Sequence, residues 1–329
     1  MRVVGLEEHF VIKEVLEAWQ SIPPEHQDLA LKPTSEGEAG RLVQELGPER
    51  IAAMDDAGID IQVLSLTSPG VQNLDETTAV ALARLSNDAL VDAIRTNPDK
   101  FQGFATLPTP APNAAARELD RAVSELGLQG AMVFGRTGNQ NLDHPDYWPI
   151  FEVASALKAP LYIHPQTSRS GVRDAYYTGI SKEVDAIFAL PGIGWHYETG
   201  IQIIRLALAG VFERFPDLQI ITGHMGEVML YYLDRIDMLS GPAKLPRKVS
   251  EYIQQHVYVT PSGLFSQRYL RWAIEVLGVA RIMMSTDYPF VKAEKGIART
   301  FLQEANLTGD DQLKIASGNW NRLCSEIRR

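Results

Sequence analysis

Short apolar and β-branched runs alternate along this chain with longer amphipathic stretches. The first are typical of buried strands and the second of helices, so the pattern predicts strands that alternate with helices around a parallel sheet. Eight runs are predicted as strands, at residues 3–6, 61–66, 103–107, 130–134, 160–164, 218–224, 257–260 and 281–285. Helices are predicted between them, for example at residues 49–57, 77–96, 111–126, 147–157, 198–215, 264–276 and 310–323.

Eight strands, most of them followed by a helix, favour a closed α/β barrel, the (β/α)8 or TIM barrel, over an open doubly wound sheet. The chain has no G-x-G-x-x-G after its first predicted strand and no G-x-x-x-x-G-K-[ST] anywhere. Because these are the usual nucleotide-binding motifs, their absence argues against a Rossmann dehydrogenase. The length of 329 residues fits one barrel with insertions, so we expect a single domain over residues 1–329.

Two segments exceed a minimal barrel, at residues 11–48 and 165–197, and the second is rich in glycine, serine and aromatic residues. Loops of this length are usually functional lids or linkers. The second segment directly follows a predicted strand, so we expect it to be an inserted lid over the C-terminal face of the barrel.

Composition narrows the possible partners. The formal net charge is -10 and no Lys/Arg-rich run occurs, which argues against nucleic acid and favours a small substrate. The single cysteine, Cys324, excludes an intrachain disulfide and a cysteine-based zinc site, and it fits the cytoplasm. No apolar run approaches the ~20 residues of a membrane span and no signal peptide is recognisable, so we expect Met1 to begin the mature protein and no membrane association.

Candidate chemistry lies at the ends of four predicted strands, where a buried strand would normally stay apolar. The first strand runs into Glu7-Glu8-His9, and the others end at His164, at His224 and shortly before Asp287. Residues two apart in a strand share a face, so Glu7 and His9 point together and Glu8 points to the opposite face. Strand ends of a barrel converge at one mouth, so we expect these side chains to meet there.

Each of these residues alone is more often structural, because a lone buried histidine is usually a hydrogen-bonded core residue. Their coincidence at four strand ends is what favours a site. Three other histidines, His26, His144 and His256, lie in polar or loop-like contexts and are interpreted as structural or exposed. The sequence leaves His196 undecided.

The motifs E-E-H-F, L-Y-I-H-P, I-T-G-H-M-G-E and M-S-T-D-Y-P-F resemble the aromatic-acid decarboxylase branch of the amidohydrolase superfamily, most closely γ-resorcylate and dihydroxybenzoate decarboxylases. The similarity runs along nearly the whole chain, including L-S-L-T-S-P-G-V-Q and W-H-Y-E-T. Hydrolases of the superfamily usually begin with H-x-H, whereas this chain has Glu7-x-His9, which favours the decarboxylase branch. Residues 167–191 depart from the family pattern and leave the substrate open.

A metal site of Glu7, His9, His164 and Asp287 combines nitrogen and oxygen ligands without thiolate. Such a set suits one divalent ion, Zn2+ or Mn2+, with coordination positions left open for substrate. The apolar run at residues 130–134 has no lysine that could bridge two metals, which favours one ion. We expect no organic cofactor.

The resemblance also implies roles for individual residues. Asp287 would protonate the ring carbon that bears the carboxylate. His224 and Glu227 stand at i and i+3 where the strand is expected to enter a helix, so Glu227 could orient an imidazole that exchanges the proton of a substrate hydroxyl. A first-turn charge on that helix is the competing interpretation of Glu227.

Two arginines match positions that the family uses near the substrate. Arg235 could instead form a salt bridge with Asp234 or Asp237. Arg50 is the weaker candidate, because exposed helical arginines are common.

The function that these observations favour is metal-dependent, non-oxidative decarboxylation of a hydroxylated aromatic carboxylic acid. The alternative within enzymes is a hydrolase of a lactone, amide or ester that uses a metal-activated water. A barrel retained only for binding is a third possibility, although its usual signature, a broken ligand set, is missing. The resemblance implies a homo-oligomer, a dimer or tetramer, and the 11–48 insertion offers surface for it.

Overall fold

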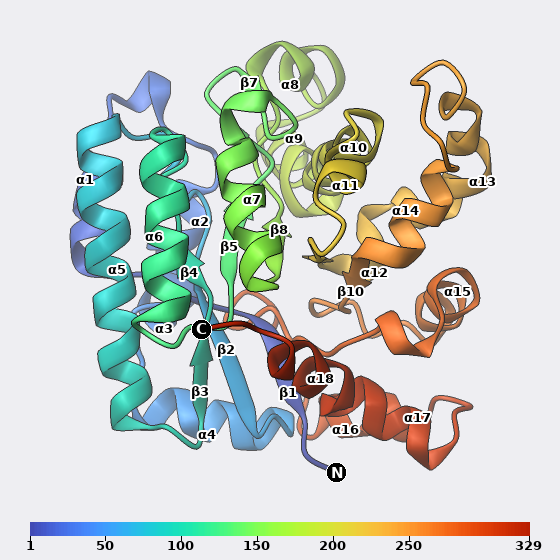
Figure 1. Ribbon diagram of the computed structural model, residues 1–329. Coiled ribbons are helices and arrows are strands. Elements are labelled where there is room, and N and C mark those ends of the chain that lie inside the picture. The colour runs from blue at the N-terminus through green and yellow to red at the C-terminus, as the bar shows by residue number, and fades with distance from the viewer.

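Parallel strands form a closed ring at the centre of the protein, which a computed structural model describes over all 329 residues (Figure 1). Neighbouring strands of the ring pair in parallel, except at two joints. In ring order the regular strands are β1 (Val4–Phe10), β2 (Ile61–Leu66), β3 (Phe101–Gly103), β4 (Ala105–Thr106), β5 (Ala131–Phe134), β8 (Leu161–His164), β9 (Ile220–Thr222) and β10 (Val257–Val259).

Two joints complete the ring. Phe104 links β3, which pairs with β2, to β4, which pairs with β5, so these two short strands act as one. At the other joint Ile282 bridges to Val259, and Met284 bridges to Gly5 in β1. The strand predicted at residues 281–285 therefore takes the eighth position, although it makes only isolated bridges. The predicted barrel is confirmed.

Helices cover the outside of the ring, and α5, α6 and α7 stand side by side on the left of Figure 1. The helices between and after the barrel strands are α4 (Pro48–Ala57), α5 (Glu76–Thr96), α6 (Pro112–Ser124), α7 (Trp148–Leu157), α10 (Gly194–Leu208), α11 (Val211–Arg214), α14 (Val249–His256), α15 (Gln267–Leu277), α16 (Ile297–Gln303), α17 (Gly309–Leu313) and α18 (Asn319–Ser325).

Some helix predictions need correction. The helix predicted at residues 198–215 begins earlier, at Gly194, and is interrupted at Gly210, whose φ of +76° is a left-handed conformation that glycine adopts without strain. The helix predicted at residues 310–323 is divided into α17, a π-helical turn and α18. The helices α14 and α16 were not predicted.

The two insertions contain short helices rather than extended loops. The first holds α1 (Lys13–Ser21), a 3-10 turn (Pro24–His26), α2 (Leu31–Ser35) and α3 (Gly37–Leu42). The second holds α8 (Ser170–Tyr176), α9 (Lys182–Ile187) and a π-helical turn (Phe188–Gly192). A small hairpin of β6 (Arg136–Thr137) and β7 (Gln140–Asn141) precedes α7.

Alternate strand residues fill the barrel interior. Trp320 and Leu323 of α18 pack into this interior cluster, and the Trp320 ring meets Phe104 edge to face at 5.5 Å. The other members of the cluster are Val4, Leu6, Ile61, Val63, Phe104, Met132, Tyr162, Ile221, Tyr258 and Met283. Residues of the opposite parity, such as Leu64, Val133 and Ile163, pack outward against the helices.

A β-bulge in β1 shifts this alternation just before the polar residues. Gly5 is paired with Gln62 and Glu8 with Leu64, so three steps along β1 face two steps along β2. An extra residue of this kind reverses which side chains face inward beyond the bulge. Leu6 can thus fill the barrel interior while Glu7 and His9 also point inward, toward the mouth.

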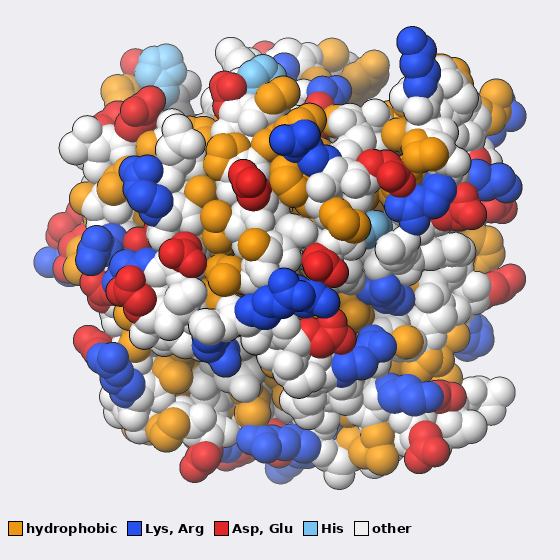
Figure 2. Space-filling model, viewed as in Figure 1, with side chains coloured by type: hydrophobic (Ala, Val, Ile, Leu, Met, Phe, Trp, Pro, Cys, Tyr) orange, Lys and Arg blue, Asp and Glu red, His pale blue; other side chains and the backbone are white.

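The face of the molecule in Figure 2 carries interspersed acidic and basic side chains without a broad patch of one sign. None of the helices is both long enough and apolar enough to cross a membrane.

Candidate metal centre

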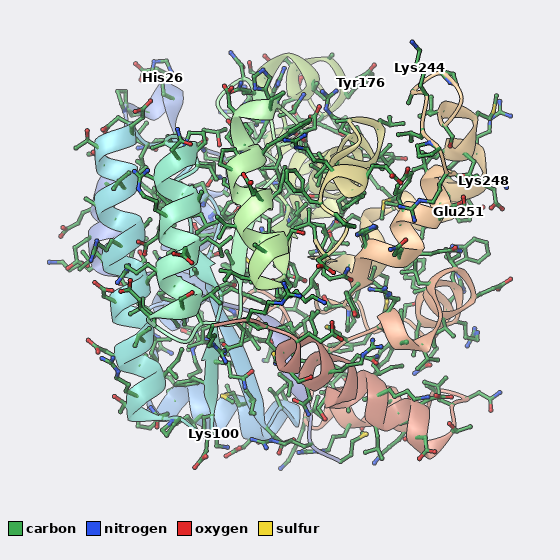
Figure 3. All side chains as sticks on the ribbon, viewed as in Figure 1. His26, Lys100, Tyr176, Lys244, Lys248 and Glu251 are labelled. Carbon is green, nitrogen blue, oxygen red and sulfur yellow. The ribbon has the colours of Figure 1, made fainter.

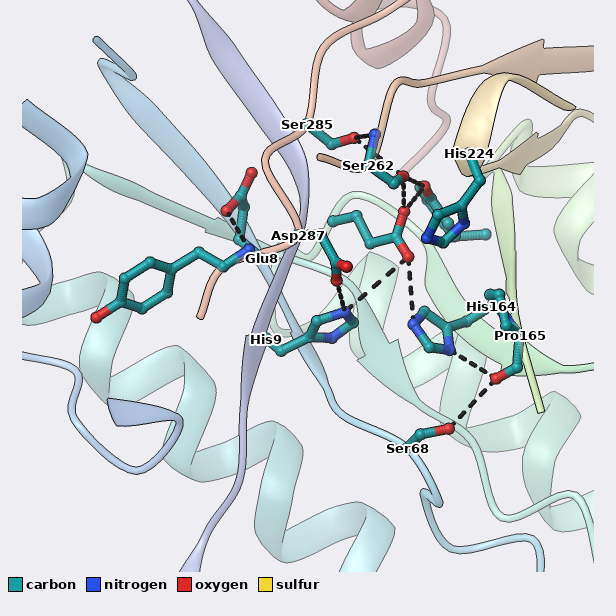
Figure 4. A network of polar contacts seen from close by, with 12 residues as sticks. Glu8, His9, Ser68, His164, Pro165, His224, Ser262, Ser285 and Asp287 are labelled. Carbon is teal, nitrogen blue, oxygen red and sulfur yellow. Dashed lines mark hydrogen bonds and ion pairs between the residues drawn. The ribbon is translucent and has the colours of Figure 1, made fainter. Parts of the chain in front are cut away.

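Four side chains converge at the mouth of the barrel, and their ligand atoms all lie within 4.8 Å of one another. Glu7 and His9 come from β1, His164 ends β8, and Asp287 follows the eighth strand position. The Glu7 Oε1 atom lies 3.2 Å from His164 Nε2 and 4.0 Å from His9 Nε2, while His9 Nε2 lies 3.2 Å from Asp287 Oδ1 (Figure 4). All four residues predicted as metal ligands are therefore brought together.

Several of these buried atoms lack hydrogen-bond partners within the protein. They are Glu7 Oε1 and both ring nitrogens of His9. Unpaired buried polar atoms are rare in native proteins, and a group of them that faces one point indicates a bound group. His164 Nδ1 lies 2.7 Å from the Pro165 carbonyl oxygen, which can only accept, so Nδ1 carries the hydrogen and the Nε2 lone pair faces Glu7. The residues present fit a divalent transition ion.

The electrostatics keep these groups in forms that can bind a cation. Burial raises the pKa of Glu7, but His224, His164 and His9 outweigh it and hold that pKa well below its ordinary value. Burial lowers the pKa of His9, and the opposing attraction of Asp287 does not restore it. At neutral pH the site therefore presents a carboxylate and a neutral imidazole.

Glu8 points away from this cluster, as the alternation of β1 predicts, and joins β1 to the segment that carries Asp287. Its carboxylate accepts hydrogen bonds from the Thr286 backbone N–H at 2.8 Å and from the Thr286 hydroxyl at 2.6 Å. Burial raises the pKa of Glu8 to about 8, although the Thr286 hydrogen bonds and the Arg50 charge oppose that shift.

Glu227 lies between two imidazoles beside the metal centre. His224 Nδ1 is 2.8 Å from Glu227 Oε1, and His196 Nδ1 is 2.7 Å from Glu227 Oε2. Burial would raise the pKa of Glu227, but the two histidines outweigh it and lower that pKa. Burial would lower the pKa of His224, but the charges of Glu227 and Glu7 raise it to about 10. The pair of His224 and Glu227 has the contact predicted from its spacing.

His196 is the member of this group that sequence reasoning left undecided. Its ring centre lies 4.5 Å from that of His224, and its Nε2 is 3.0 Å from the Pro191 carbonyl oxygen. A signal was present in W-H-Y-E-T, where His196 lies in the first turn of α10, which follows the 165–197 segment's π-helical turn. No local pattern indicated that it would share Glu227 with His224.

The contact between His224 and Glu227 has a different origin from the one predicted. From His224 to Val228 every residue has a positive φ, at 46°, 55°, 93°, 52° and 55°. The short helical segment α12 (His224–Glu227) is thus a left-handed turn rather than the start of an ordinary helix. Each non-glycine residue in this conformation costs roughly 1–2 kcal/mol. The competing interpretation of Glu227 as a first-turn charge is wrong, because Glu227 lies within the left-handed turn and the next helical segment, a 3-10 turn (Met229–Tyr232), begins only after it.

Arg50 lies inside the protein and not at the barrel mouth. It is fully buried, and its guanidinium donates to the His9 carbonyl at 2.5 Å, to the Glu45 carbonyl at 2.7 Å and to Gln62 Oε1 at 3.1 Å. It also lies over the Tyr288 ring, 4.6 Å from the centroid. The contact with the His9 carbonyl supports the backbone of β1. The competing interpretation of Arg50 as an exposed helical arginine is wrong, because Arg50 is fully buried, and this burial also disfavours the direct substrate contact predicted for it.

Arg235 lies on the short helix α13 (Leu233–Ile236), where its side chain is exposed. It forms no ion pair with Asp234 or Asp237, which was the alternative to a substrate contact. Asp237 instead accepts hydrogen bonds from the Ser250 backbone and hydroxyl.

The 165–197 segment lies against the metal centre at both of its ends. At its start Gln166, Thr167 and Ser168 are buried, and at its end the Trp195 ring lies 6.2 Å from the His164 ring. Arg136 joins the start of the segment to α10, because it donates to the Thr167 carbonyl and, at 3.1 Å, to Glu198.

Aromatic residues contribute unequally to the surroundings of the site. Phe134 lies 5.5 Å from the His164 ring, and Phe290 lies at the same distance from the His9 ring. By contrast, Tyr176 is 72% exposed at the rim of the molecule (Figure 3), and Phe188 is also exposed. Of the aromatic residues in the 165–197 segment, Trp195 is the one whose ring lies next to a metal ligand.

The remaining histidines lie away from the site. His26 is exposed at the edge of the molecule (Figure 3), and His144 is half exposed beside Gln140. His256 is buried and donates from Nδ1 to the Leu218 carbonyl at 2.8 Å. Their interpretation as structural or exposed residues agrees with these positions.

Comparison with known proteins decides the family. The amidohydrolase family profile matches residues 19–323. The chain belongs to the amidohydrolase family. It is 34% identical to a γ-resorcylate decarboxylase from Polaromonas sp. (strain JS666), over 97% of each chain.

Solved structures of family members superpose closely on this amidohydrolase. A 5-carboxyvanillate decarboxylase from Sphingomonas paucimobilis has a TM-score of 0.89 and 31% identity over 99% of each chain. A dihydroxybenzoic acid decarboxylase from Polaromonas sp. JS666, with bound manganese and the inhibitor 2-nitroresorcinol, has a TM-score of 0.85 and 32% identity, covering 100% of this chain and 98% of that one.

Proposed function

We propose that this amidohydrolase is a metal-dependent, non-oxidative decarboxylase of a hydroxylated aromatic carboxylic acid. The observation that carries the proposal is the buried cluster of Glu7, His9, His164 and Asp287 beside the His224–Glu227 pair. It occurs in a chain that aligns end to end with decarboxylases of dihydroxybenzoates.

Glu7, His9, His164 and Asp287 would hold one divalent ion. We propose Mn2+ as its identity, because manganese is bound in related decarboxylase structures and the donor set is free of thiolate. When bound, the ion supplies a site for the anionic oxygens of an ortho-hydroxy acid and stabilises negative charge. We propose no organic cofactor.

Asp287 would act as the acid of the reaction. Its side chain is 15% exposed, so it can reach a substrate at the barrel mouth. In the step proposed, the Asp287 carboxyl gives its proton to the ring carbon that bears the carboxylate, and a carbon–hydrogen bond forms there. The bond from that carbon to the carboxylate then breaks, CO2 leaves with the ring restored, and Asp287 remains as a carboxylate.

His224 would bind the substrate hydroxyl as a phenolate and neutralise its negative charge. Its Nδ1 is held by Glu227, while its Nε2 has no partner within the protein. Because the pKa of His224 is raised to about 10, the ring is cationic at neutral pH and favours a phenolate nearby. We propose Arg235, which is exposed on α13, as a further substrate-binding residue because it matches a position that the family uses near the substrate. We propose Arg50 as a residue that supports His9 from behind.

The test is to incubate the Mn2+-loaded protein with a panel of hydroxybenzoates and, separately, with lactones, amides and esters. We expect CO2 and the corresponding phenol from at least one ortho-hydroxybenzoate. Hydrolysis of a lactone, amide or ester without any CO2 release would replace the proposal with the hydrolase alternative. Absence of both reactions in protein that retains its metal would favour a barrel kept only for binding.

We also propose that the protein is a homo-oligomer. Large apolar side chains are exposed together on and next to α13 and α15, with Tyr231 at 71%, Tyr232 at 60%, Met238 at 61% and Trp272 at 40%. Exposed apolar surface of this kind is typical of contacts between subunits. Light scattering should report a multiple of the 36.5 kDa chain mass. The single domain over residues 1–329 and the cytoplasmic location remain predictions.

A further inference from the structure

We propose that Tyr162 and Ser262 are positioning residues that hold Glu7 so that only its Oε1 atom faces His9 and His164. This inference rests on the proposed metal site. The two oxygens of Glu7 have different surroundings: Oε2 accepts hydrogen bonds from both the Tyr162 and the Ser262 hydroxyl, whereas Oε1 has no hydrogen-bond partner. This asymmetry leaves Oε1 free to bind an ion together with the two histidines, while hydrogen bonds hold Oε2.

The two hydroxyls are themselves fixed by neighbours. Thr260 Oγ1 lies 2.8 Å from the Tyr162 hydroxyl and 3.0 Å from Ser262 Oγ, and the Ser262 backbone N–H donates to Ser285 Oγ at 2.8 Å. Because Tyr162 and Ser262 each have one hydroxyl hydrogen and direct it to Glu7, Thr260 must donate to one of them. All four hydroxyl residues are at most 2% exposed. Water therefore does not compete for these hydrogen bonds.

The backbone leaves room for this arrangement at Gly223. A Cβ atom added there would lie 2.5 Å from Glu7 Oε2 and 2.5 Å from Ser262 Oγ. Its φ of -83° suits any residue, so the need for glycine is steric and not conformational. An alanine at this position would push on the same two atoms that the proposed hydrogen bond joins.

The arrangement has a consequence for the metal centre. A carboxylate that offers one oxygen to an ion occupies one coordination position and leaves another for substrate. Groups that orient a ligand in this way typically contribute 10-fold to 100-fold to metal affinity. Tyr162 and Ser262 would therefore act on metal binding and not through contact with substrate.

The experiment measures the Mn2+ dissociation constant by competition with a fluorescent chelator for the full chain and for Tyr162→Phe, Ser262→Ala and Gly223→Ala. Tyr252→Phe is the matched control, because Tyr252 is also fully buried and also donates its hydroxyl to a carboxylate, Glu213, at 2.6 Å, but outside the metal centre. We expect each of the three variants to bind Mn2+ about 10-fold to 100-fold more weakly and Tyr252→Phe to bind as the original protein does.

Thermal unfolding of the metal-free proteins separates orientation from general loss of stability. Mn2+ affinity within about twofold of the original protein in Tyr162→Phe and Ser262→Ala, or an equal loss in Tyr252→Phe, would overturn the positioning role. If the proposed metal site itself were wrong, the original protein and Glu7→Gln would bind Mn2+ equally poorly, which distinguishes that outcome from failure of the positioning role.

Discussion

Glu8 accepts two hydrogen bonds from Thr286, one from the backbone N–H at 2.8 Å and one from the hydroxyl at 2.6 Å. The first strand and the end of the last are thereby locked together on the outer side of the barrel wall. On the inner side, the residues that follow them in sequence, His9 and Asp287, face each other at 3.2 Å. The closure of the barrel and the assembly of the metal centre thus depend on the same junction.

Thr286→Val should destabilise the protein by about 1–3 kcal/mol, because it removes a hydroxyl donor from the buried carboxyl group of Glu8 without changing the side-chain shape. Urea unfolding of the metal-free protein measures the effect. Thr96→Val, at the exposed end of α5, is the control and should change the free energy of unfolding little. Equal stabilities for the two variants would mean that the Thr286 hydroxyl contributes nothing to this junction.

Asp287→Asn should retain much of the metal and lose turnover by about 10²–10⁴-fold, since an amide oxygen can still face an ion but the side chain can no longer transfer a proton. Metal content and decarboxylation rate are measured on the same sample. Asp143→Asn serves as a control of equal side-chain exposure, 15%, outside the metal centre. Loss of metal together with activity would leave Asp287 as a ligand without evidence of an acid role.

His224→Asn should lower turnover by roughly 10²-fold or more while metal content is unchanged, because His224 is proposed to face the substrate hydroxyl and is not among the four ligands. Elemental analysis measures the metal content, and initial rates measure the turnover. A variant that is purified without metal would instead make His224 a ligand.

Acid should weaken the fold through His256. Burial lowers its pKa from an ordinary value of 6.5, and its Nε2 has no partner that could accept a hydrogen. The unfolded chain therefore takes up this proton at a higher pH than the folded protein, so the stabilisation is present above about pH 6.5 and is lost as the pH falls toward the folded pKa.

His256→Asn keeps a donor for the Leu218 carbonyl but does not titrate. Its free energy of unfolding should fall less than that of the original protein between about pH 7.5 and pH 5.5. The same pH dependence in both proteins would contradict the role of His256.

The reaction should run backward in concentrated bicarbonate. The acidic Glu7 in place of a first histidine adds negative charge and makes a bound water less acidic, so less hydroxide forms. This disfavours hydrolysis but not the binding of a chelating hydroxy acid. Labelled bicarbonate mixed with resorcinol-, catechol- and guaiacol-type phenols should place label in an aromatic acid. No labelled acid across the panel, with clear lactone hydrolysis, would count against the decarboxylase.

The sequence by itself determined the barrel and the residue types of the metal centre. Both depend on local patterns: apolar runs of strand length, helical spacing between them, and ligand-type residues such as His164 at strand ends. Because parallel strands of a barrel end at one mouth, that local information was enough to predict which side chains would meet.

Only the tertiary structure decided how those side chains are held. The bulge in β1 turns both Leu6 and Glu7 inward, and the left-handed run through Met225 and Val228 opposes the local preference of those residues. Three further features involve residues far apart in the chain. They are the contacts of the Arg50 guanidinium, the hydrogen bonds of Glu227 with two histidines, and the hydroxyl groups that donate to Glu7. Such contacts exist only once the ring has closed, because packing around each residue then outweighs its local conformational preference.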